Sequence, residues 1–180
     1  MSRKLSILVV VLLLLANLST IEVKASTHTI TKTGSGSIIL VASGFEVNRD
    51  SKFITLLISL PSFRHYRYRV KIGYSLKVIA GGLGSYAKSQ VSTSVGWSRS
   101  IDYLSDGAVG DVKEDEGVWT SPWYSGYGSS ISISVKLYAE AKLGDADFNS
   151  YARAEVEAEV TLEVEYPDLV TIEVVGQGST

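Results

Sequence analysis

The sequence YARAEVEAEVTLEVEY, residues 151–166, alternates between apolar and polar side chains along its whole length. Every even position is apolar, and every odd position after Tyr151 is polar, most often glutamate. A period of two is typical of a β-strand with one buried and one exposed face, whereas a helix needs apolar residues three and four apart. The stretch therefore predicts a strand about 50 Å long at ~3.3 Å per residue, much longer than the usual ~5–6 residues.

Other parts of the chain show the same alternation. Residues 66–78, 87–98 and 131–143 are the longer candidates, and residues 28–33, 37–47, 52–60 and 169–175 are shorter ones. Residues 53–60 are apolar on both faces, which predicts a central strand covered on both sides. Glycine-, asparagine- and proline-rich turns separate these stretches. The fold predicted is all-β: a single β-sandwich, jelly-roll or Ig-like, of about eight long antiparallel strands.

The first 25 residues have the organisation of a secretory signal peptide. Arg3 and Lys4 precede an apolar run over residues 5–16, and Val23-Lys24-Ala25 provides a cleavage site. The run is shorter than the ~20 residues of a membrane-spanning helix, although an uncleaved anchor is the alternative. We expect a signal peptide over residues 1–25 and one domain over residues 26–180, secreted to the outside or the cell surface, with no membrane span after cleavage.

Charge and cysteine content narrow the function classes. Removing residues 1–25 lowers Lys plus Arg from 17 to 14 and Asp plus Glu from 19 to 18, which leaves a net charge of −4. An acidic chain argues against a nucleic-acid partner, which needs a basic surface. The chain has no cysteine, so its stability must come from apolar burial and sheet pairing rather than from disulfides.

No pattern of catalytic residues stands out. The chain has two histidines, His28 and His65, no cysteine nucleophile and no G-x-S-x-G motif. A glycosidase needs only two carboxylates, so residue types alone do not exclude an enzyme. The sequence favours a non-enzymatic protein, and no catalytic residue is predicted.

One short segment resembles a calcium loop in its residue types. Asp145, Asp147 and Asn149 have the D-x-D-x-N spacing of carboxylate and amide oxygen ligands. Ser150 stands where such loops need glycine, and Val156 stands where they close with glutamate. A polar turn that caps its own backbone is therefore the favoured interpretation, with calcium as the one candidate ion and no other cofactor expected.

Residues 106–130 are rich in glycine, acidic residues and aromatic rings, and predict a long loop. The loop holds Trp119, Trp123, Tyr124 and Tyr127 within nine positions. Exposed planar rings can stack on sugars, so these four residues are candidates for binding a polysaccharide. The alternative is that the rings fold back and cover one end of the sandwich.

The polar faces of two predicted strands carry opposite charges: the strand over residues 66–78 is basic and the strand over residues 151–166 is acidic. Glutamates two apart on one face are ~7 Å from each other and repel by about 0.6 kcal/mol per pair in water. Antiparallel pairing with the basic strand could place Glu155, Glu157 and Glu159 beside Lys71, Arg69 and Arg67. We predict that the two strands are sheet neighbours or meet across a subunit contact; simple solvation of both faces is the alternative.

The N-terminal segment of the expected mature chain suggests assembly. Residues 26–33 favour a β-strand and precede the flexible sequence Gly34-Ser35-Gly36-Ser37. A terminal strand on a hinge can be lent to a neighbour, with Thr29, Ile30 and Thr31 as the candidate contacts, or it can pair within its own domain. The sequence therefore predicts a structural or cell-surface protein, a filament subunit that self-associates by strand exchange. A carbohydrate-binding module is the alternative, and an enzyme or a pore-former comes third.

Overall fold

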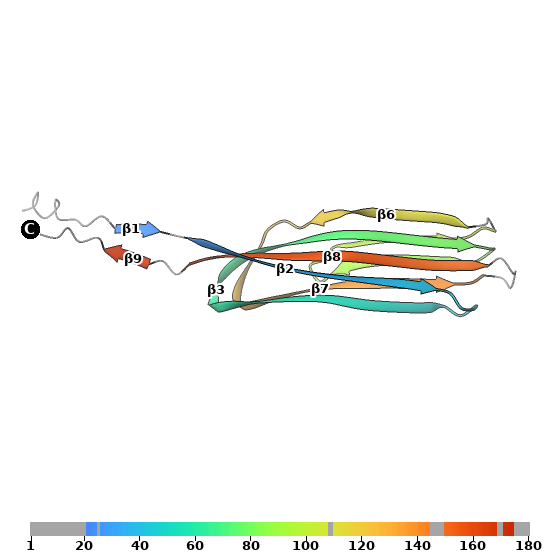
Figure 1. Cartoon of the computed structure of the whole chain (residues 1–180), viewed down its shortest axis with the longest axis horizontal. Helices are drawn as coiled ribbons and strands as arrows, with labels where there is room; N and C mark the ends of the chain where they lie inside the picture. The colour runs from blue at the N-terminus through green and yellow to red at the C-terminus, as the bar shows by residue number, and fades with distance from the viewer. Residues whose placement is uncertain (1–20, 25, 108–109, 145–149, 169–170, 175–180) are drawn as a thin grey trace, which may run out of the picture. The chain divides into compact units, whose positions relative to one another are not determined.

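The computed structural model describes residues 21–24, 26–107, 110–144, 150–168 and 171–174, which form strands and no helix (Figure 1). Every strand pair with a defined register is antiparallel. The fold is all-β, as the alternation predicts. The strands are β1 (Ile21–Lys24), β2 (Thr27–Val41), β3 (Asn48–Gly81), β4 (Tyr86–Thr93), β5 (Ser98–Leu104), β6 (Asp111–Thr120), β7 (Tyr124–Lys142), β8 (Tyr151–Pro167) and β9 (Thr171–Val174).

The chain divides by its internal contacts into two compact units. The smaller unit contains residues 1–28 and 167–180, in which β1 pairs with β9. The larger unit, residues 29–166, contains the seven-stranded sheet in the order β2-β8-β3-β7-β4-β5, with β6 also paired to β3.

The seven-stranded sheet folds into two facing layers. Layer A consists of β2, β8, the second half of β3 and β6, and layer B consists of the first half of β3, β7, β4 and β5. Positions of β2 in layer A lie directly over Ile54 and Leu56 of layer B. The apolar core lies between the layers, as in a β-sandwich.

One strand belongs to both layers because β3 turns a corner. Residues 48–59 of β3 pair with β7, and residues 67–81 pair with β8. The register with β7 shifts between Ser59 and Arg64, where β3 carries extra residues that include Pro61. Extra residues in one strand bend it and increase its twist. The sequence marks Pro61 as a turn, and the structure shows a corner inside a continuous strand.

The inner face of β8 confirms the prediction from residues 151–166. All eight apolar positions, from Ala152 to Tyr166, are buried. Small side chains gather at one end of the core, where Ala80 of β3 lies opposite Ala152 and Ala87 of β4 lies opposite Ala141. Larger side chains lie at the other end of β8, where Leu162, Val164 and Tyr166 are buried.

Three predictions about strands are wrong. Residues 28–33 and 37–47 are not separate strands on either side of a hinge, because β2 is continuous from Thr27 to Val41. Residues 53–60 do not form a central strand covered on both sides, because β3 is bonded only to β7 there and Phe53 and Leu57 are exposed. Residues 106–130 are not one long loop, because β6 and the start of β7 occupy most of them. β6 lacks an apolar alternation at its start because Asp111, Lys113 and Asp115 contact polar groups of β5.

Candidate functional site

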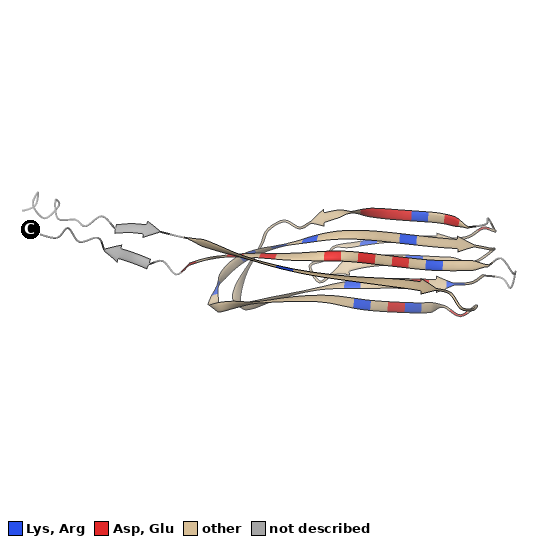
Figure 2. Cartoon of the chain, viewed as in Figure 1, with Lys and Arg blue, Asp and Glu red and all other residues tan. Residues whose placement is uncertain are grey.

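The charged faces of β3 and β8 meet as neighbours, which confirms that the two strands pair (Figure 2). The register differs from the predicted one by six residues. Glu165 lies opposite Arg67, Glu163 opposite Arg69 and Glu155 opposite Lys77. Arg67 Nε donates to the Glu165 carboxylate at 2.6 Å, and Arg69 Nε donates to the Glu163 carboxylate at 2.7 Å. A depression of about 250 Å³ beside them is lined by Arg69, Lys71, Thr120, Thr161 and Glu163.

The middle of the acidic strand lacks such partners. Glu157 lies opposite Ser75 and Glu159 lies opposite Gly73, and both glutamates are exposed. Among the described residues, neither carboxylate has a cation within ion-pair distance. The row of glutamates on β8 therefore faces basic residues at its two ends and carries unbalanced negative charge at its centre, at Glu157 and Glu159.

The candidate assembly residues Thr29, Ile30 and Thr31 lie in β2, at the edge of layer A. Hydrogen bonds from Ala42 N to Ala152 O and from Asp168 N to Ser26 O give the same antiparallel register with β8 at both ends of the strand. Of the side chains of β2, only Ile38 is buried. The segment thus pairs within its own chain as an edge strand, with Ile30 and Leu40 partly buried against the core.

Two glycines of β2 face the core where other strands carry apolar side chains. A Cβ atom at Gly34 would lie 2.9 Å from Leu56, and one at Gly36 would lie 3.2 Å from Ile54 and 3.3 Å from Leu137. Such distances leave almost no room for a side chain. The glycines therefore let the backbone of β2 lie directly on the apolar surface of layer B.

The four aromatic candidates do not form one platform. Trp119 lies in β6 and stacks on Trp97, with ring centroids 4.9 Å apart and an interplanar angle of 14°. Trp97 in turn contacts Tyr74, with centroids 5.5 Å apart. Both tryptophans are partly buried against the core. These two rings pack against the core instead of presenting a free face to solvent.

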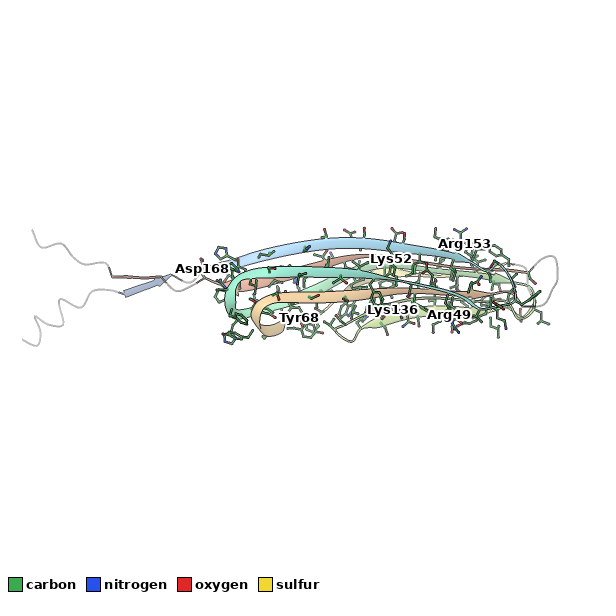
Figure 3. All side chains as sticks on the ribbon, turned by 90° about the horizontal axis from the view of Figure 1, so that it is seen from below. Arg49, Lys52, Tyr68, Lys136, Arg153 and Asp168 are labelled. Carbon is green, nitrogen blue, oxygen red and sulfur yellow. The ribbon has the colours of Figure 1, made fainter. Side chains whose placement is uncertain are left out.

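Trp123 and Tyr124 also have occupied faces. The guanidinium groups of Arg67 and Arg69 lie 4.7 and 4.8 Å from the Trp123 ring centroid, within cation–π distance. Tyr124 lies opposite Tyr68, and their ring centroids are 5.2 Å apart; Tyr68 is labelled in Figure 3. Burial raises the pKa of Tyr68, helped by the neighbouring tyrosines.

Tyr127 is different, because it is exposed at the corner of β3. Its side chain is 63% exposed and lies 4.8 Å from the His65 ring and 6.1 Å from the Phe63 ring between centroids. Phe63 is 69% exposed. We call Phe63, His65 and Tyr127 the aromatic corner. Phe63 was not among the residues singled out from the sequence, since only the register of β3 with β7 brings it to Tyr127.

A polar seam joins the outer strands β5 and β6, which belong to different layers. Arg99 Nε lies 2.5 Å from Asp115 Oδ2, and the Tyr103 hydroxyl donates to Asp111 at 2.6 Å. The Asp115 hydrogen bond raises the pKa of Arg99, and the Asp111 hydrogen bond raises the pKa of Tyr103. Side chains rather than a backbone ladder hold these two edges together.

Other predictions fall partly or wholly outside the described residues. The calcium candidates Asp145, Asp147 and Asn149 lie there, as does most of the signal peptide. In the part of the chain that is described, no three His, Asp or Glu side chains are grouped to hold a metal ion. The same residues contain no helix with the length and apolar character needed to cross a membrane.

Comparisons with known proteins give limited information. No protein-family model and no curated protein sequence matches the chain. The chain is similar to the solved structure of infectious bursal disease virus Gx strain at 11% identity and a TM-score of 0.30, covering 82% of this chain and 37% of that one. It is similar to sacbrood virus of honeybee at 11% identity and a TM-score of 0.30, covering 83% and 75%.

A third similar structure is the exo-beta-1,3-galactanase from Phanerochaete chrysosporium with galactose, at 14% identity and a TM-score of 0.22, covering 75% of this chain and 29% of that one. The chain thus spans well under half the length of the bursal virus protein and the galactanase. TM-scores below 0.5 carry no argument about the function of this chain.

Proposed function

We propose that the chain is a secreted, non-enzymatic structural protein of the cell surface or its surroundings, which assembles with other copies by donating β2. The observation that carries the proposal is the position of β2 as a weakly anchored edge strand near the N-terminus. Among the described strands its backbone pairs with β8 alone. It fully buries one side chain, Ile38, and partly buries Ile30 and Leu40, whereas β8 fully buries eight. A strand with few buried contacts can leave its place at low cost and be replaced by the same strand of a neighbour.

The position that β2 occupies has the features of an acceptor groove. Its floor is the apolar surface of Ile54 and Leu56, and its wall is the hydrogen-bonding edge of β8. Gly34 and Gly36 give a donated strand the thin backbone that this floor requires. Cleavage after Ala25 would also remove β1, the pairing partner of β9, and leave Ser26 directly before the donated strand.

Disulfide trapping tests this exchange, because the chain has no cysteine of its own. The register at both ends of β2 places Ser37 opposite Glu157, and both side chains are exposed. Directly opposite residues have Cα atoms ~4.5–5.5 Å apart, within the range of a disulfide. If β2 is donated, the double variant S37C/E157C should give a ladder of covalent oligomers on a non-reducing gel.

The matched control is S75C/E116C, which joins opposite residues of β3 and β6 within one chain. That variant should run as a monomer whether or not β2 is exchanged. Negative-stain microscopy should show filaments of the mature chain, and removal of residues 26–36 should abolish them. Monomeric bands from S37C/E157C at every protein concentration, with no filaments, would disprove strand donation.

A second candidate function is carbohydrate binding, and the aromatic corner is the observation that favours it. Tyr127 and Phe63 are the exposed rings there, whereas Trp119, Trp123 and Tyr124 have faces occupied by other side chains. Retention of the mature chain on insoluble cellulose, chitin and xylan would test it. Y127A should lose retention and W123A should keep it. Passage of the unmodified chain through all three matrices would count against this function.

A further inference from the structure

Among the described strands, only β7 pairs with the first half of β3, which leaves its other backbone edge open. Residues in an antiparallel ladder alternate between those that exchange hydrogen bonds with the opposite residue and those whose N–H and C=O point away. Thr55 lies opposite Ser134 of β7. The Ser134 carbonyl points away from β3, because it accepts a hydrogen bond from Ser94 N at 2.9 Å on the other side of β7. Thr55 and its odd-numbered neighbours Phe53 and Leu57 therefore direct their backbone groups away from β7.

One of these outward groups is in contact with β2, because Lys32 Nζ donates to the Leu57 carbonyl at 3.0 Å. Lysine is a common guard of sheet edges, since its charge and length discourage pairing with another strand. Lys32 is exposed and flexible, so it can release the carbonyl when a better partner arrives. One lysine side chain therefore contacts this edge, but no described strand pairs with it.

The side chains on the outer face of the same residues are apolar and exposed. Phe53 is 61% exposed and Leu57 is 50% exposed. Lys136 of β7, labelled in Figure 3, lies opposite Phe53, and its Nζ is 6.0 Å from the ring centroid. An open edge that also carries exposed apolar side chains is a site for pairing with another strand.

The order of residues along this edge is symmetrical. The outward positions are Ser51, Phe53, Thr55, Leu57 and Ser59, so that polar and apolar side chains alternate identically on both sides of Thr55. A two-fold axis through Thr55 would place Phe53 of each copy opposite Leu57 of the other, and Ser51 opposite Ser59. The same axis brings Ile54 beside Leu56 on the inner face, which extends both cores into one surface.

We infer that residues 51–59 of β3 form a symmetric dimer contact with the same edge of a second copy, paired antiparallel about Thr55. A two-fold interface must be self-complementary, and this edge is self-complementary in both its backbone groups and its side chains. An edge evolved for an unrelated strand needs no such symmetry. The contact does not depend on donation of β2, because it uses a different edge of the sheet.

Single cysteines in the cysteine-free chain test the register of the contact. T55C lies on the two-fold axis, where Cα atoms would be ~5.5 Å apart, and it should form a disulfide dimer under mild oxidation. F53C alone should not, because its copies would be offset by four residues, roughly 13 Å along the strand. A mixture of F53C with L57C should give the dimer. Dimers from T55C and F53C in equal yield, or from neither, would overturn the proposal.

Mass measurement by light scattering after size exclusion gives a second test of the same contact. F53K and L57K should each raise the dimer dissociation constant at least ten-fold, because they place like charges along the shared edge. V118K is the matched control, since Val118 is 65% exposed on β6, and it should leave the constant unchanged. K32M should lower the dimer dissociation constant, because it removes the lysine that occupies the Leu57 carbonyl. A dimer that survives both F53K and L57K would disprove the contact.

Discussion

Arg69 and Glu163 lie directly opposite each other on β3 and β8, with Nε of the arginine 2.7 Å from Oε2 of the glutamate. Both side chains are only partly exposed, and Arg69 also covers the Trp123 ring. The pair thus links a cross-strand ion pair to an aromatic contact on the outer face of layer A. Its neighbour Lys71 lies opposite uncharged Thr161 and provides a natural comparison.

Replacing Arg69 should destabilise the fold modestly. Partly exposed cross-strand ion pairs contribute about 0.2–1 kcal/mol, and R69M should lower the free energy of unfolding by an amount in that range. K71M should change it less, because no carboxylate faces Lys71 directly. Urea unfolding followed by tryptophan fluorescence measures both. Added salt should reduce the difference between the variants, and a larger loss for K71M would contradict the assignment.

Removing one central glutamate should stabilise the protein. Glu157 and Glu159 are ~7 Å apart on one face, and their repulsion is about 0.6 kcal/mol in water before screening by salt. E157Q should therefore raise the urea midpoint at low ionic strength, and the gain should vanish near 1 M salt. E163Q is the matched control and should have the opposite sign, since it removes the partner of Arg69. Equal changes in the urea midpoint for E157Q and E163Q would refute the conclusion that Glu163 has a basic partner and Glu157 has none.

A side chain at Gly36 should disturb the contact between β2 and layer B. The Cβ atom alone would lie 3.2 Å from Ile54, so G36V must push apart a packed core at a cost of about 1–3 kcal/mol. S35V, on the outer face of the same strand, should be neutral or slightly stabilising because valine favours strands. Thermal unfolding of both variants provides the comparison. A neutral G36V would show that β2 does not rest on this surface.

The β5–β6 seam should weaken at alkaline pH. The hydrogen bond to Asp111 raises the pKa of Tyr103 above its ordinary value of 10.0, so the folded state holds this proton more tightly than the unfolded state. The stabilisation from the tyrosine is fully present below pH ~10 and is lost as the pH rises through the raised pKa. Unfolding midpoints between pH 9 and 12 should fall more steeply for the natural chain than for Y103F. Parallel curves would exclude this contribution.

The sequence is a reliable guide where one face of a strand is uniformly apolar. The eight apolar positions from Ala152 to Tyr166 predict a buried face, and all of them are buried. The alternation also shows that residues 66–78 form a strand with a basic face. Both predictions need only the period of two, because burial acts on each strand face regardless of its neighbours.

The register between those strands could not be obtained in this way. A shift by any even number of residues keeps the same faces inward, so the alternation is equally satisfied by many registers. The predicted pairing gave each of three glutamates a basic partner. The observed pairing leaves Glu157 and Glu159 opposite Ser75 and Gly73. It places Ala80 opposite Ala152 at one end and Tyr68 opposite Val164 at the other. The charges on the two polar faces therefore do not decide the register, and the alternation does not contain it.

The aromatic candidates show a similar limit. Trp119, Trp123, Tyr124 and Tyr127 are close in sequence, yet each meets a different neighbour from a distant segment. Proximity along the chain predicts a shared site only when the segment is a loop. In a strand, successive residues point to opposite faces and spread over many ångströms.

The passage of β3 through both layers has a consequence for cooperativity. Neither layer has a complete set of strands without this one segment, so a partial opening of either removes hydrogen-bonding partners from the other. The two layers should therefore unfold in a single transition, with the same midpoint whether followed by tryptophan fluorescence or by far-ultraviolet circular dichroism of the whole sheet. A chain without disulfides can in this way behave as one all-or-none unit, held together by the continuity of its longest strand.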